Sequence, residues 1–318
     1  DKPIILRAQT PGEVILTGKT YLRITGEHLI VRDLIFDKAE GANIVSFMNA
    51  DHCRLTETAF FNSGDPESTQ NHLITLRDGS SYNHIEYSYM EGNLSIGIGI
   101  KAKDGDFNNT DNVIGHIYFK NIIRRSQNGQ EAIQVGQGPE SQMKEMRALV
   151  EYCLFENASG DGEIISNKSS YNTYQYNTFR NSQGALVLRG GHTVTVKGNY
   201  FLNNTCGVIV HGAYHKVINN YFDGVNVAIS LPTGTGQGEQ SGPYQTVEHG
   251  LFAHNTILHT YQKAIYIGQN EGRVEGVFTW DKPPIDNKFI NNLIMSFRGT
   301  LIQNNNQDGT IWENNIVK

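Results

Sequence analysis

Three basic side chains recur at nearly equal spacing in the middle of the sequence. Lys168, Arg189 and His211 are separated by 21 and 22 residues, and two carboxylates, Asp161 and Glu163, precede the lysine. If this spacing is a repeat of β-strands, the three basic groups stack on neighbouring strands about 4.8 Å apart. They then form a local cationic strip, which could bind a polyanion and move a proton.

Oxygen-bearing side chains lie near this strip. Asp161 and Glu163 are two positions apart, so on an extended segment both carboxylates point to the same side. Asn128 and Glu131, in the segment NGQE, lie one repeat earlier. Oxygen ligands beside a Lys and Arg pair are typical of a metal site coupled to an acid–base pair. A simpler interpretation stays open, in which the two acids are solvated or form salt bridges with Lys168.

Two histidines complete the candidate site. His192 lies in the turn RGGH, and His211 ends the basic series. We predict that both contact substrate, as does Glu131, although packing is an alternative role for His211. A glycosidase needs two carboxylates that face each other across a groove, and acids side by side suit metal ligation better. The sequence contains no GxSxG, P-loop, dinucleotide or HExxH motif.

Short β-strands in a repeat are the elements that would position these residues. The segments around Phe179, Phe201 and Phe222 share an alternating apolar strand, an Asn-(Thr/Tyr)-Phe element, a polar turn and a second apolar strand. Weaker copies are centred on Phe36, Phe60, Met90, Phe155, Ile257, Ile294 and Val317, with a longer interval between Ile123 and Phe155. A unit of 21 to 24 residues without helical periodicity predicts an all-β fold, a right-handed parallel β-helix with an asparagine ladder at its turns. The leucine spacing of the rival leucine-rich repeat is absent.

The longer intervals predict loops that leave the solenoid. They are NSGDPESTQ (62–70), PTGTGQGEQSGPYQ (232–245) and GQNEGRVEGVFTWDKPPID (268–286). Loops on one flank of a solenoid usually wall a binding groove. We expect a single β-helix domain over residues 1–318.

Composition excludes several classes of protein. The chain has 26 Lys and Arg against 32 Asp and Glu, a net charge of −6, so nucleic acid is not an expected partner. A polyanion would need a local cationic or metal-bearing groove. No apolar run approaches the roughly 20 residues that span a bilayer, so no membrane partner is expected. Three scattered cysteines without a CxxC pair exclude a disulfide framework and a structural zinc site.

The sequence resembles the parallel β-helix polysaccharide lyases of family 6, which comprise alginate lyases and the dermatan-sulfate lyase chondroitinase B. The most specific segments are NGQEAIQVG, DGEIISNKSSYNTYQYNTFRNSQGALVLRGG and VKGNYFLNN. The interval of 21 residues between Lys168 and Arg189 is also that of the family. The resemblance spans most of the chain, and the family's first coil is expected to be missing before Asp1.

The resemblance implies a role for each matching residue. Asn128, Asp161 and Glu163 match the Ca²⁺ ligands, Lys168 the base and Arg189 the acid. In β-elimination of a 1→4-linked uronate, the base removes the C5 proton and the C4 oxygen leaves. A guanidinium is a weak acid, so we expect Arg189 mainly to stabilise the departing oxygen electrostatically.

Three positions depart from the family pattern. Asp161 stands where the family usually has Glu, and its side chain is one methylene shorter. Gly190 replaces a His that commonly follows the catalytic Arg, and Gln134 replaces an Arg often found after the NGxE element. These departures affect the calcium site and the contacts with individual sugars more than the Lys and Arg chemistry.

The resemblance favours an alginate lyase that leaves an unsaturated uronate. The NGQE and NTFRNSQGAL segments look more like those of alginate enzymes than those of dermatan-sulfate enzymes. The alternatives are a dermatan-sulfate or chondroitin lyase and a noncatalytic β-helix that binds acidic glycan. Pectate lyases share the fold, but their base is typically Arg. An acidic polysaccharide is the expected partner, Ca²⁺ the expected cofactor, and a secreted or periplasmic protein the expected location.

Overall fold

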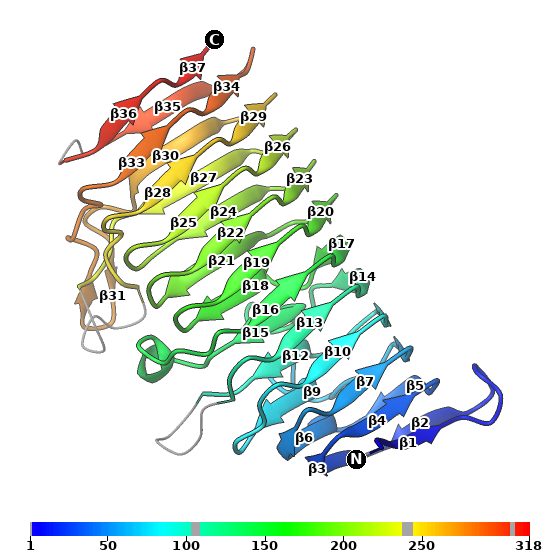
Figure 1. Cartoon of the computed structure of the whole chain (residues 1–318). Coiled ribbons are helices and arrows are strands. Elements are labelled where there is room, and N and C mark those ends of the chain that lie inside the picture. Colours follow the sequence, from blue (N-terminus) through cyan, green and yellow to red (C-terminus); the bar gives the residue numbers. More distant parts are fainter. Residues whose placement is uncertain (1, 103–108, 237–243, 306–308) are drawn as a thin grey trace.

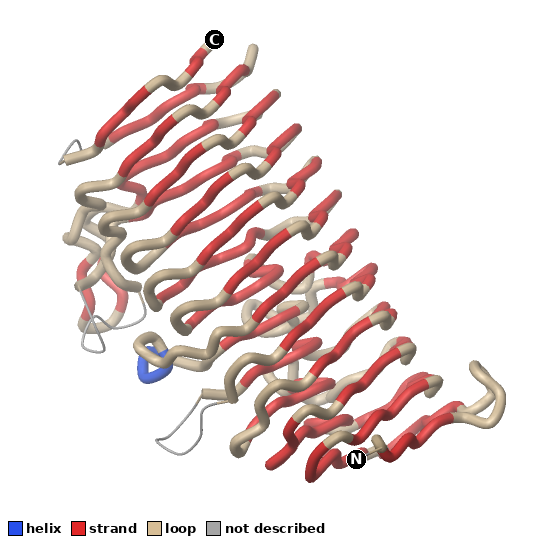
Figure 2. Tube along the Cα trace, in the orientation of Figure 1, coloured by secondary structure: helices blue, strands red, loops and turns tan. Residues whose placement is uncertain are grey.

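The chain winds as a parallel β-helix (Figure 1). The computed structural model describes residues 2–102, 109–236, 244–305 and 309–318. The coils contribute strands to three parallel sheets, here named sheets A, B and C. Figure 2 shows the coils stacked along one axis, with the two termini at opposite ends. The predicted all-β parallel β-helix is confirmed.

The strands follow one another in the order A, B, C along most of the described chain. Sheet A consists of β1 (Ile4–Arg7), β4 (Leu29–Arg32), β7 (Arg54–Thr56), β10 (His84–Glu86), β13 (Val113–Gly115), β16 (Leu149–Glu151), β19 (Thr173–Gln175), β22 (Thr195–Lys197), β25 (Lys216–Ile218), β28 (Leu251–Ala253), β33 (Lys288–Ile290) and β36 (Ile311–Glu313). Sheet B consists of β2 (Ile15–Lys19), β5 (Ile35–Glu40), β8 (Ala59–Phe61), β11 (Tyr89–Glu91), β14 (Tyr118–Ile123), β17 (Leu154–Ser159), β20 (Thr178–Arg180), β23 (Tyr200–Leu202), β26 (Tyr221–Asp223), β29 (Thr256–Leu258), β34 (Leu293–Met295) and β37 (Ile316–Val317). Sheet C consists of β3 (Leu22–Glu27), β6 (Asn43–Asp51), β9 (His72–Arg77), β12 (Ile96–Ile100), β15 (Ile133–Val135), β18 (Glu163–Lys168), β21 (Ala185–Gly190), β24 (Cys206–Val210), β27 (Val227–Pro232), β30 (Lys263–Gln269) and β35 (Thr300–Asn304).

Sheet B carries an aromatic stack on its inner face. Phe155, Phe179, Phe201 and Phe222 are register partners on neighbouring strands, and their side chains are fully buried. Their ring centroids are 4.6 to 4.8 Å apart. Stacking removes the rings from water and adds favourable ring contacts, so each coil is stabilised by its neighbours. The register of the predicted repeat is therefore confirmed for these coils.

One landmark of the predicted repeat is wrong. Ile123 is 75% exposed and ends β14, whereas Phe119 is the fully buried member of the stack. Phe119 pairs with Met90 on one side and with Phe155 on the other. The error has a physical cause, because β14 continues past the core position and its final residue faces solvent.

A ladder of asparagines lies at the turn between sheets A and B. The side-chain amide of Asn177 donates to Asn199, Asn199 to Asn220, Asn220 to Asn255 and Asn255 to Asn292, at 2.9 to 3.1 Å. These amides are buried, so the ladder satisfies polar groups that would otherwise be costly to remove from water. The predicted asparagine ladder is confirmed.

Long connections surround the outer face of sheet C. They include residues 62–71 before β9, residues 124–132 before β15 and residues 136–148 after β15, which contain the short 3-10 helix η1 (Pro139–Ser141). The described parts of the connection after β27 are residues 233–236 and 244–250, and residues 270–287 follow β30 and contain the hairpin β31 (Val274–Glu275) and β32 (Phe278–Thr279). The described residues contain no helix of the length and apolarity that crossing a membrane requires.

Candidate active site

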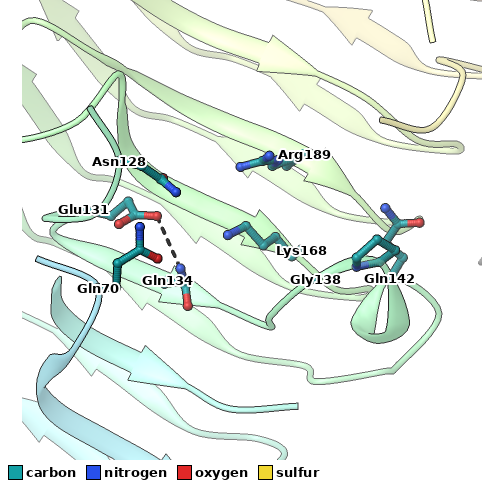
Figure 3. Close-up of a pocket in the computed structure, with 9 residues that line it drawn as sticks. Gln70, Asn128, Glu131, Gln134, Gly138, Gln142, Lys168 and Arg189 are labelled. Atoms are coloured by element: carbon teal, nitrogen blue, oxygen red, sulfur yellow. Dashed lines mark hydrogen bonds between the residues drawn. The ribbon is translucent and has the colours of Figure 1, made fainter. Parts of the chain in front are cut away.

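A polar cavity of about 180 Å³ lies on the outer face of sheet C. Lys168 of β18 and Arg189 of β21 form part of its wall. The remaining lining residues come from the long connections and from β15: Gln70, Asn128, Glu131, Gln134, Gly138, Pro139 and Gln142. Figure 3 shows Lys168, Arg189, Asn128 and Glu131 directed into the same cavity. The structure therefore brings together four of the residues that the sequence singles out.

Lys168 and Arg189 stand on paired strands, but a β-bulge separates them. Asn167 pairs with Leu188 and Lys168 pairs with Gly190, with a register shift between the two pairs. Arg189 is therefore the extra residue of the bulge. A bulge re-aims a side chain, and here both cations reach one cavity although they are not direct register partners.

The guanidinium of Arg189 is held on two sides. Its Nη1 lies 3.3 Å from Oε1 of Glu163, and its Nη2 donates to the hydroxyl of Tyr244 at 3.3 Å. Its Cζ also lies 5.0 Å from the centre of the Tyr244 ring, a cation–π contact. Burial would lower the pKa of Arg189, but Glu163, Tyr244, Glu131 and Asp161 together outweigh burial, and the net shift is upward. Arg189 therefore stays a cation and is unsuited to accept a proton.

Three acids beside the two cations have unpaired oxygens. Glu131 Oε2, Asp161 Oδ2 and Glu163 Oε2 are buried and have no hydrogen-bond partner among the described residues. Burial raises the pKa of Glu131 to about 7, and the negative charges of Glu163 and Asp161 add to this rise while Lys168 opposes it. Burial and Glu163 also raise the pKa of Asp161. The acids therefore repel one another, and Lys168 and the Arg189 ion pair offset this repulsion only in part.

The unpaired oxygens of these acids are of the kind that a hard divalent cation binds. Buried carboxylates are stable when they are paired or coordinate a metal, and Ca²⁺ prefers carboxylate and amide oxygens. Within the described residues, no three His, Cys, Asp or Glu side chains are gathered closely enough to bind a metal by themselves. The side-chain oxygen of Asn128, the other ligand that the resemblance implies, accepts the backbone N–H of Gly129 at 3.1 Å.

Gln134 contributes to the floor of the cavity. Its side-chain amide donates to Oε1 of Glu131 at 3.2 Å, so it orients the carboxylate whose other oxygen is unpaired. Gln134 stands at one of the departures from the family pattern, where an Arg is often found. A neutral donor at this position orients Glu131 without neutralising its charge.

The two histidines lie outside this cavity. His192 lines a neighbouring cavity of about 390 Å³ together with Met143, Gly191, Ala213, Tyr214, Gln245 and Glu248. His211 is only 2% exposed and lies beneath Tyr244 and Trp280, with ring centroids 5.1 and 5.7 Å away. Two aromatic side chains from long connections thus cover His211, an arrangement that agrees with the alternative packing role, and substrate contact by His211 stays a prediction. Substrate contact by His192 stays a prediction.

Several lining residues escaped the sequence reasoning. Gln70 ends the first predicted loop, whose role as a wall was foreseen although the residue was not. Tyr244, which belongs to the second predicted loop, does not line the cavity but contacts Arg189. Gly138 and Gln142 lie next to η1, where the sequence shows only a long interval without a motif. Loops have no periodic spacing, so the sequence alone does not predict which loop residues line the cavity.

The three parallel sheets place the chain in the class of parallel β-helix proteins. Within this class, the sequence model of the family described as Chondroitinase B matches residues 1–318. The chain therefore belongs to the chondroitinase B family, polysaccharide lyase family 6. No curated protein matches the chain in sequence.

Solved structures of the same family are similar to this one. A mannuronic acid specific family 6 lyase from the human gut microbiota is 29% identical, with a TM-score of 0.83, and the match covers 95% of this chain and 71% of that chain. A family 6 polysaccharide lyase from Pseudopedobacter saltans is 25% identical, with a TM-score of 0.85 and coverage of 100% and 82%. The alginate lyase AlyGC is 26% identical, with a TM-score of 0.85, and the chain spans 45% of its length.

Proposed function

We propose that this protein is an alginate lyase that cleaves the 1→4 bond of a polyuronate by β-elimination. The observation that carries the proposal is the convergence of Lys168 and Arg189, from paired strands, in one polar cavity beside buried acids. The similar structures named for a mannuronic acid specific lyase and an alginate lyase support alginate as the substrate.

Lys168 is the proposed base. Its side chain lines the cavity and would enter the reaction as the free amine, take the C5 proton and become an ammonium. The electron pair of the C5–H bond then forms the double bond between C4 and C5, and the C4–O bond breaks. Arg189 cannot take this role, because its surroundings keep it protonated.

Arg189 is proposed to stabilise the leaving oxygen. A fixed guanidinium aimed at a developing negative charge needs little reorganisation as the bond breaks. Glu163 holds the guanidinium through an ion pair, and Tyr244 holds it through its hydroxyl and its ring. The proton that the leaving oxygen finally acquires comes from Arg189 in concert with bond cleavage or from water.

Asn128, Asp161 and Glu163 are the residues proposed to hold Ca²⁺. The unpaired buried oxygens of the two acids support this assignment. Bound there, the ion would supply the positive charge that neutralises a sugar carboxylate and makes the neighbouring C–H bond more acidic. The negative charges of Asp161 and Glu163 raise the pKa of Glu131, so Glu131 lies close to both acids. We propose that Glu131 contacts the sugar or takes part in the calcium site.

A dermatan-sulfate or chondroitin lyase is the second candidate, favoured by the description of the matching family. Incubation with alginate, dermatan sulfate and polygalacturonate, followed by the ultraviolet absorbance of an unsaturated uronate, separates the candidates. Absorbance with alginate alone supports the proposal. Absorbance with dermatan sulfate alone replaces it, and no absorbance with any polymer leaves a noncatalytic glycan-binding solenoid.

The substrate class also bears on location. Alginate is a polymer too large to enter a cell intact, so we propose that the protein works as a secreted or periplasmic enzyme. Fractionation of the native host, with detection of the protein in each compartment, tests this. A purely cytoplasmic protein would contradict it.

A further inference from the structure

Arg189 stands at one end of a row of aromatic and cationic side chains. Its Cζ lies 5.0 Å from the centre of the Tyr244 ring, and the ring centroids of Tyr244 and Trp280 are 4.3 Å apart. Cζ of Arg273 in turn lies 5.4 Å from the centre of the Trp280 ring. We name this series of contacts the aromatic row, with the members Arg189, Tyr244, Trp280 and Arg273.

The aromatic row joins three separate parts of the chain. Arg189 belongs to β21, and Tyr244 belongs to the connection after β27. Arg273 directly precedes β31 and Trp280 directly follows β32, at the base of the hairpin. There, the backbone N–H of Trp280 donates to the carbonyl of Arg273 at 2.8 Å. An insertion that the repeat does not require therefore reaches Arg189 through Tyr244.

Backbone contacts tie the hairpin to the segment that carries Tyr244. Gly234 and Lys282 exchange two backbone hydrogen bonds, at 2.7 and 3.1 Å. The backbone N–H of Thr235 donates to the carbonyl of Tyr244 at 2.8 Å. These bonds keep the two connections together, so the contact between Tyr244 and Trp280 does not depend on the rings alone.

Trp280 is the buried member of the aromatic row. It is 2% exposed, and its ring centroid lies 5.7 Å from that of His211. Its Nε1 is buried and has no hydrogen-bond partner among the described residues, so the indole is not held by its polar atom. Indole has a large ring surface and is the best aromatic partner for a cation. The contacts of Trp280 are therefore ring contacts, made with Tyr244, His211 and Arg273.

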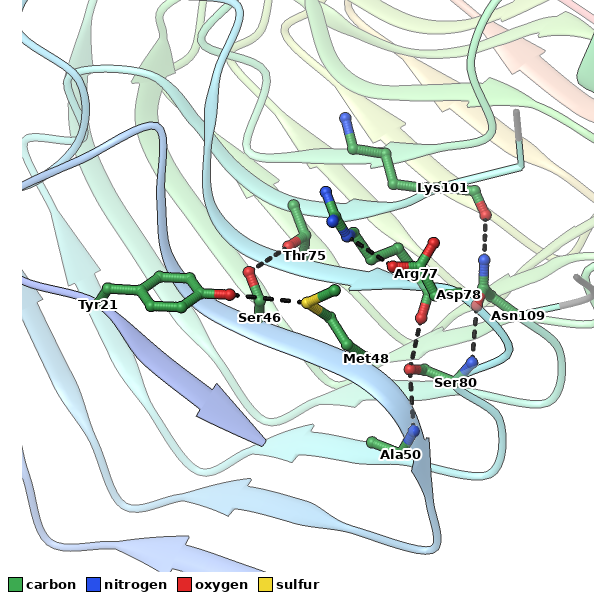
Figure 4. A network of polar contacts seen from close by, with 10 residues as sticks. All are labelled: Tyr21, Ser46, Met48, Ala50, Thr75, Arg77, Asp78, Ser80, Lys101 and Asn109. Carbon is green, nitrogen blue, oxygen red and sulfur yellow. Dashed lines mark hydrogen bonds and ion pairs between the residues drawn. The ribbon is translucent and has the colours of Figure 1, made fainter. Parts of the chain in front are cut away.

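A second arginine on the same face of sheet C offers a comparison. Arg77 and Arg189 occupy equivalent positions, because each directly follows a member of one column of register partners. Arg77 pairs with Asp78 at 3.0 Å, and its side chain is 42% exposed (Figure 4). The side chain of Arg189 is 25% exposed and contacts Tyr244 in addition to Glu163. An exposed ion pair holds a side chain weakly, so Arg189 is the more firmly fixed of the two.

The aromatic row meets the cavity only at its first member. Arg189 lines the cavity, whereas the other three residues of the row are not among its lining residues. The rings can then affect a ligand in the cavity by holding Arg189. An effect of Trp280 on the reaction would therefore reflect the position of this guanidinium.

We propose that Trp280 is a positioning residue, which acts through Tyr244 to hold the guanidinium of Arg189 toward the leaving oxygen. This inference rests on the proposed function for the reaction that Arg189 serves. It gives the insertion of residues 270–287 a role in the rate of bond cleavage.

The kinetic test compares Trp280→Phe and Trp280→Leu on alginate. Phe keeps a ring against Tyr244, whereas Leu removes the aromatic contact. We expect kcat to fall about fivefold in the Leu variant and about twofold or less in the Phe variant, with KM within about twofold of wild type. Val277→Ser, at a 90% exposed position of the same hairpin, is the matched control and should behave as wild type. Equal kcat values for wild type and Trp280→Leu would overturn the proposal.

A double variant shows whether Trp280 acts through Tyr244. Residues that act through one series of contacts have effects that do not add. In a Tyr244→Leu background, Trp280→Leu should therefore lower kcat by less than about twofold. A further loss of about fivefold in this background would mean that Trp280 acts by another route, such as the stability of the hairpin, and would overturn the proposal.

Fluorescence separates this inference from the proposed function. The chain has two tryptophans, so Trp312→Phe leaves Trp280 as the only one. In this background, Tyr244→Leu should shift the emission of Trp280 to longer wavelength and raise its quenching by acrylamide, whereas Val277→Ser should change neither. Arg189→Met should cause a smaller change in the same direction, because Tyr244 loses the cation that packs on its ring.

These changes in emission would support the aromatic row even if no polymer is cleaved, because the measurement needs no catalysis. Unchanged emission and quenching in either the Tyr244 or the Arg189 variant would overturn the inference, since Trp280 would then not be coupled to the guanidinium.

Discussion

Glu163 forms an ion pair with Arg189, which lines the cavity. Its Oε1 lies 3.3 Å from Nη1 of Arg189, while its Oε2 is buried and unpaired. The two side chains are only 17% and 25% exposed, so the pair is largely shielded from solvent. One oxygen of this carboxylate thus positions the guanidinium, and the other is the one that the proposed calcium site would use. Calcium binding and the orientation of Arg189 are expected to depend on each other.

Removal of the Glu163 charge should therefore affect both properties. Glu163→Gln keeps the size of the side chain, but a neutral amide is a poorer calcium ligand and a weaker partner for a guanidinium. We expect the Ca²⁺ affinity to fall at least about tenfold, as even loss of a supporting residue usually costs 10- to 100-fold. Calorimetric titration with Ca²⁺ and activity assays after chelation measure the effect.

The control for this experiment is Glu151→Gln, a residue of sheet A that hydrogen-bonds Gln175 instead. It should retain wild-type calcium binding. Chelation should lower the activity of the wild-type enzyme, and added Ca²⁺ should restore it. Activity that survives chelation unchanged would contradict the calcium proposal and assign carboxylate neutralisation to other protein cations or hydrogen-bond donors.

Loss of the proposed base should stop turnover without loss of binding. Lys168→Ala removes the amine, and a general base typically contributes about 10²- to 10⁴-fold. We expect less than about a hundredth of the wild-type rate, with retardation of the protein in a gel that contains alginate largely retained, because Lys168 is partly exposed and carries little packing. Lys197→Ala on sheet A is the control. A residual rate above that limit would remove Lys168 from the role of base.

Tyr244 is expected to position Arg189 through two separable contacts. Tyr244→Phe removes the hydroxyl contact and keeps the ring, whereas Tyr244→Leu removes both. A cation–π contact at a partly shielded site contributes about 1 to 2 kcal/mol, so the Leu variant should lose about tenfold more kcat than the Phe variant. KM should change less than kcat, because the effect is on the leaving group. Equal kcat values for the two variants would show that the ring does not hold Arg189.

The repeat could be predicted because its side chains are periodic. Phe179, Phe201 and Phe222 recur at the length of one coil, and the buried ring and the asparagine ladder require the same residue types on each rung. The same periodicity predicted that Lys168 and Arg189 share a face. It could not predict the bulge that pairs Lys168 with Gly190, since one extra residue in a strand leaves no trace in a spacing of 21.

The aromatic side chains that cover His211 could not be predicted from the repeat. His211 occupies the expected position in the series, but its exposure depends on where Tyr244 and Trp280 come to rest. Both lie in aperiodic insertions, whose paths depend on contacts between residues far apart in the sequence. The repeat landmark in β14 was also mispredicted. The strand continues to Ile123, which is exposed, whereas the buried core position is Phe119.

Buried histidines are expected to make the fold sensitive to acid. Burial lowers the pKa of His211 to about 3 and that of His215 to about 4, from an ordinary value of 6.5. Both are therefore neutral in the folded protein at pH values where they are charged in the unfolded chain. The unfolded state binds more protons in this range, so the free energy of unfolding rises with pH and falls as the solution is acidified below about 6.5.

The His211 contribution can be isolated by substitution. Each such histidine should lower the free energy of unfolding by about 1.4 kcal/mol per pH unit between its two pKa values. His211→Phe keeps an aromatic ring against Tyr244 and Trp280 but cannot take a proton, so its pH slope should be smaller by that amount between pH 6 and 4. Urea unfolding at several pH values measures the slope, and His254→Phe, at an exposed position, should keep the wild-type slope. An unchanged slope in His211→Phe would mean that His211 becomes protonated in the folded state, which requires the aromatic cover to open.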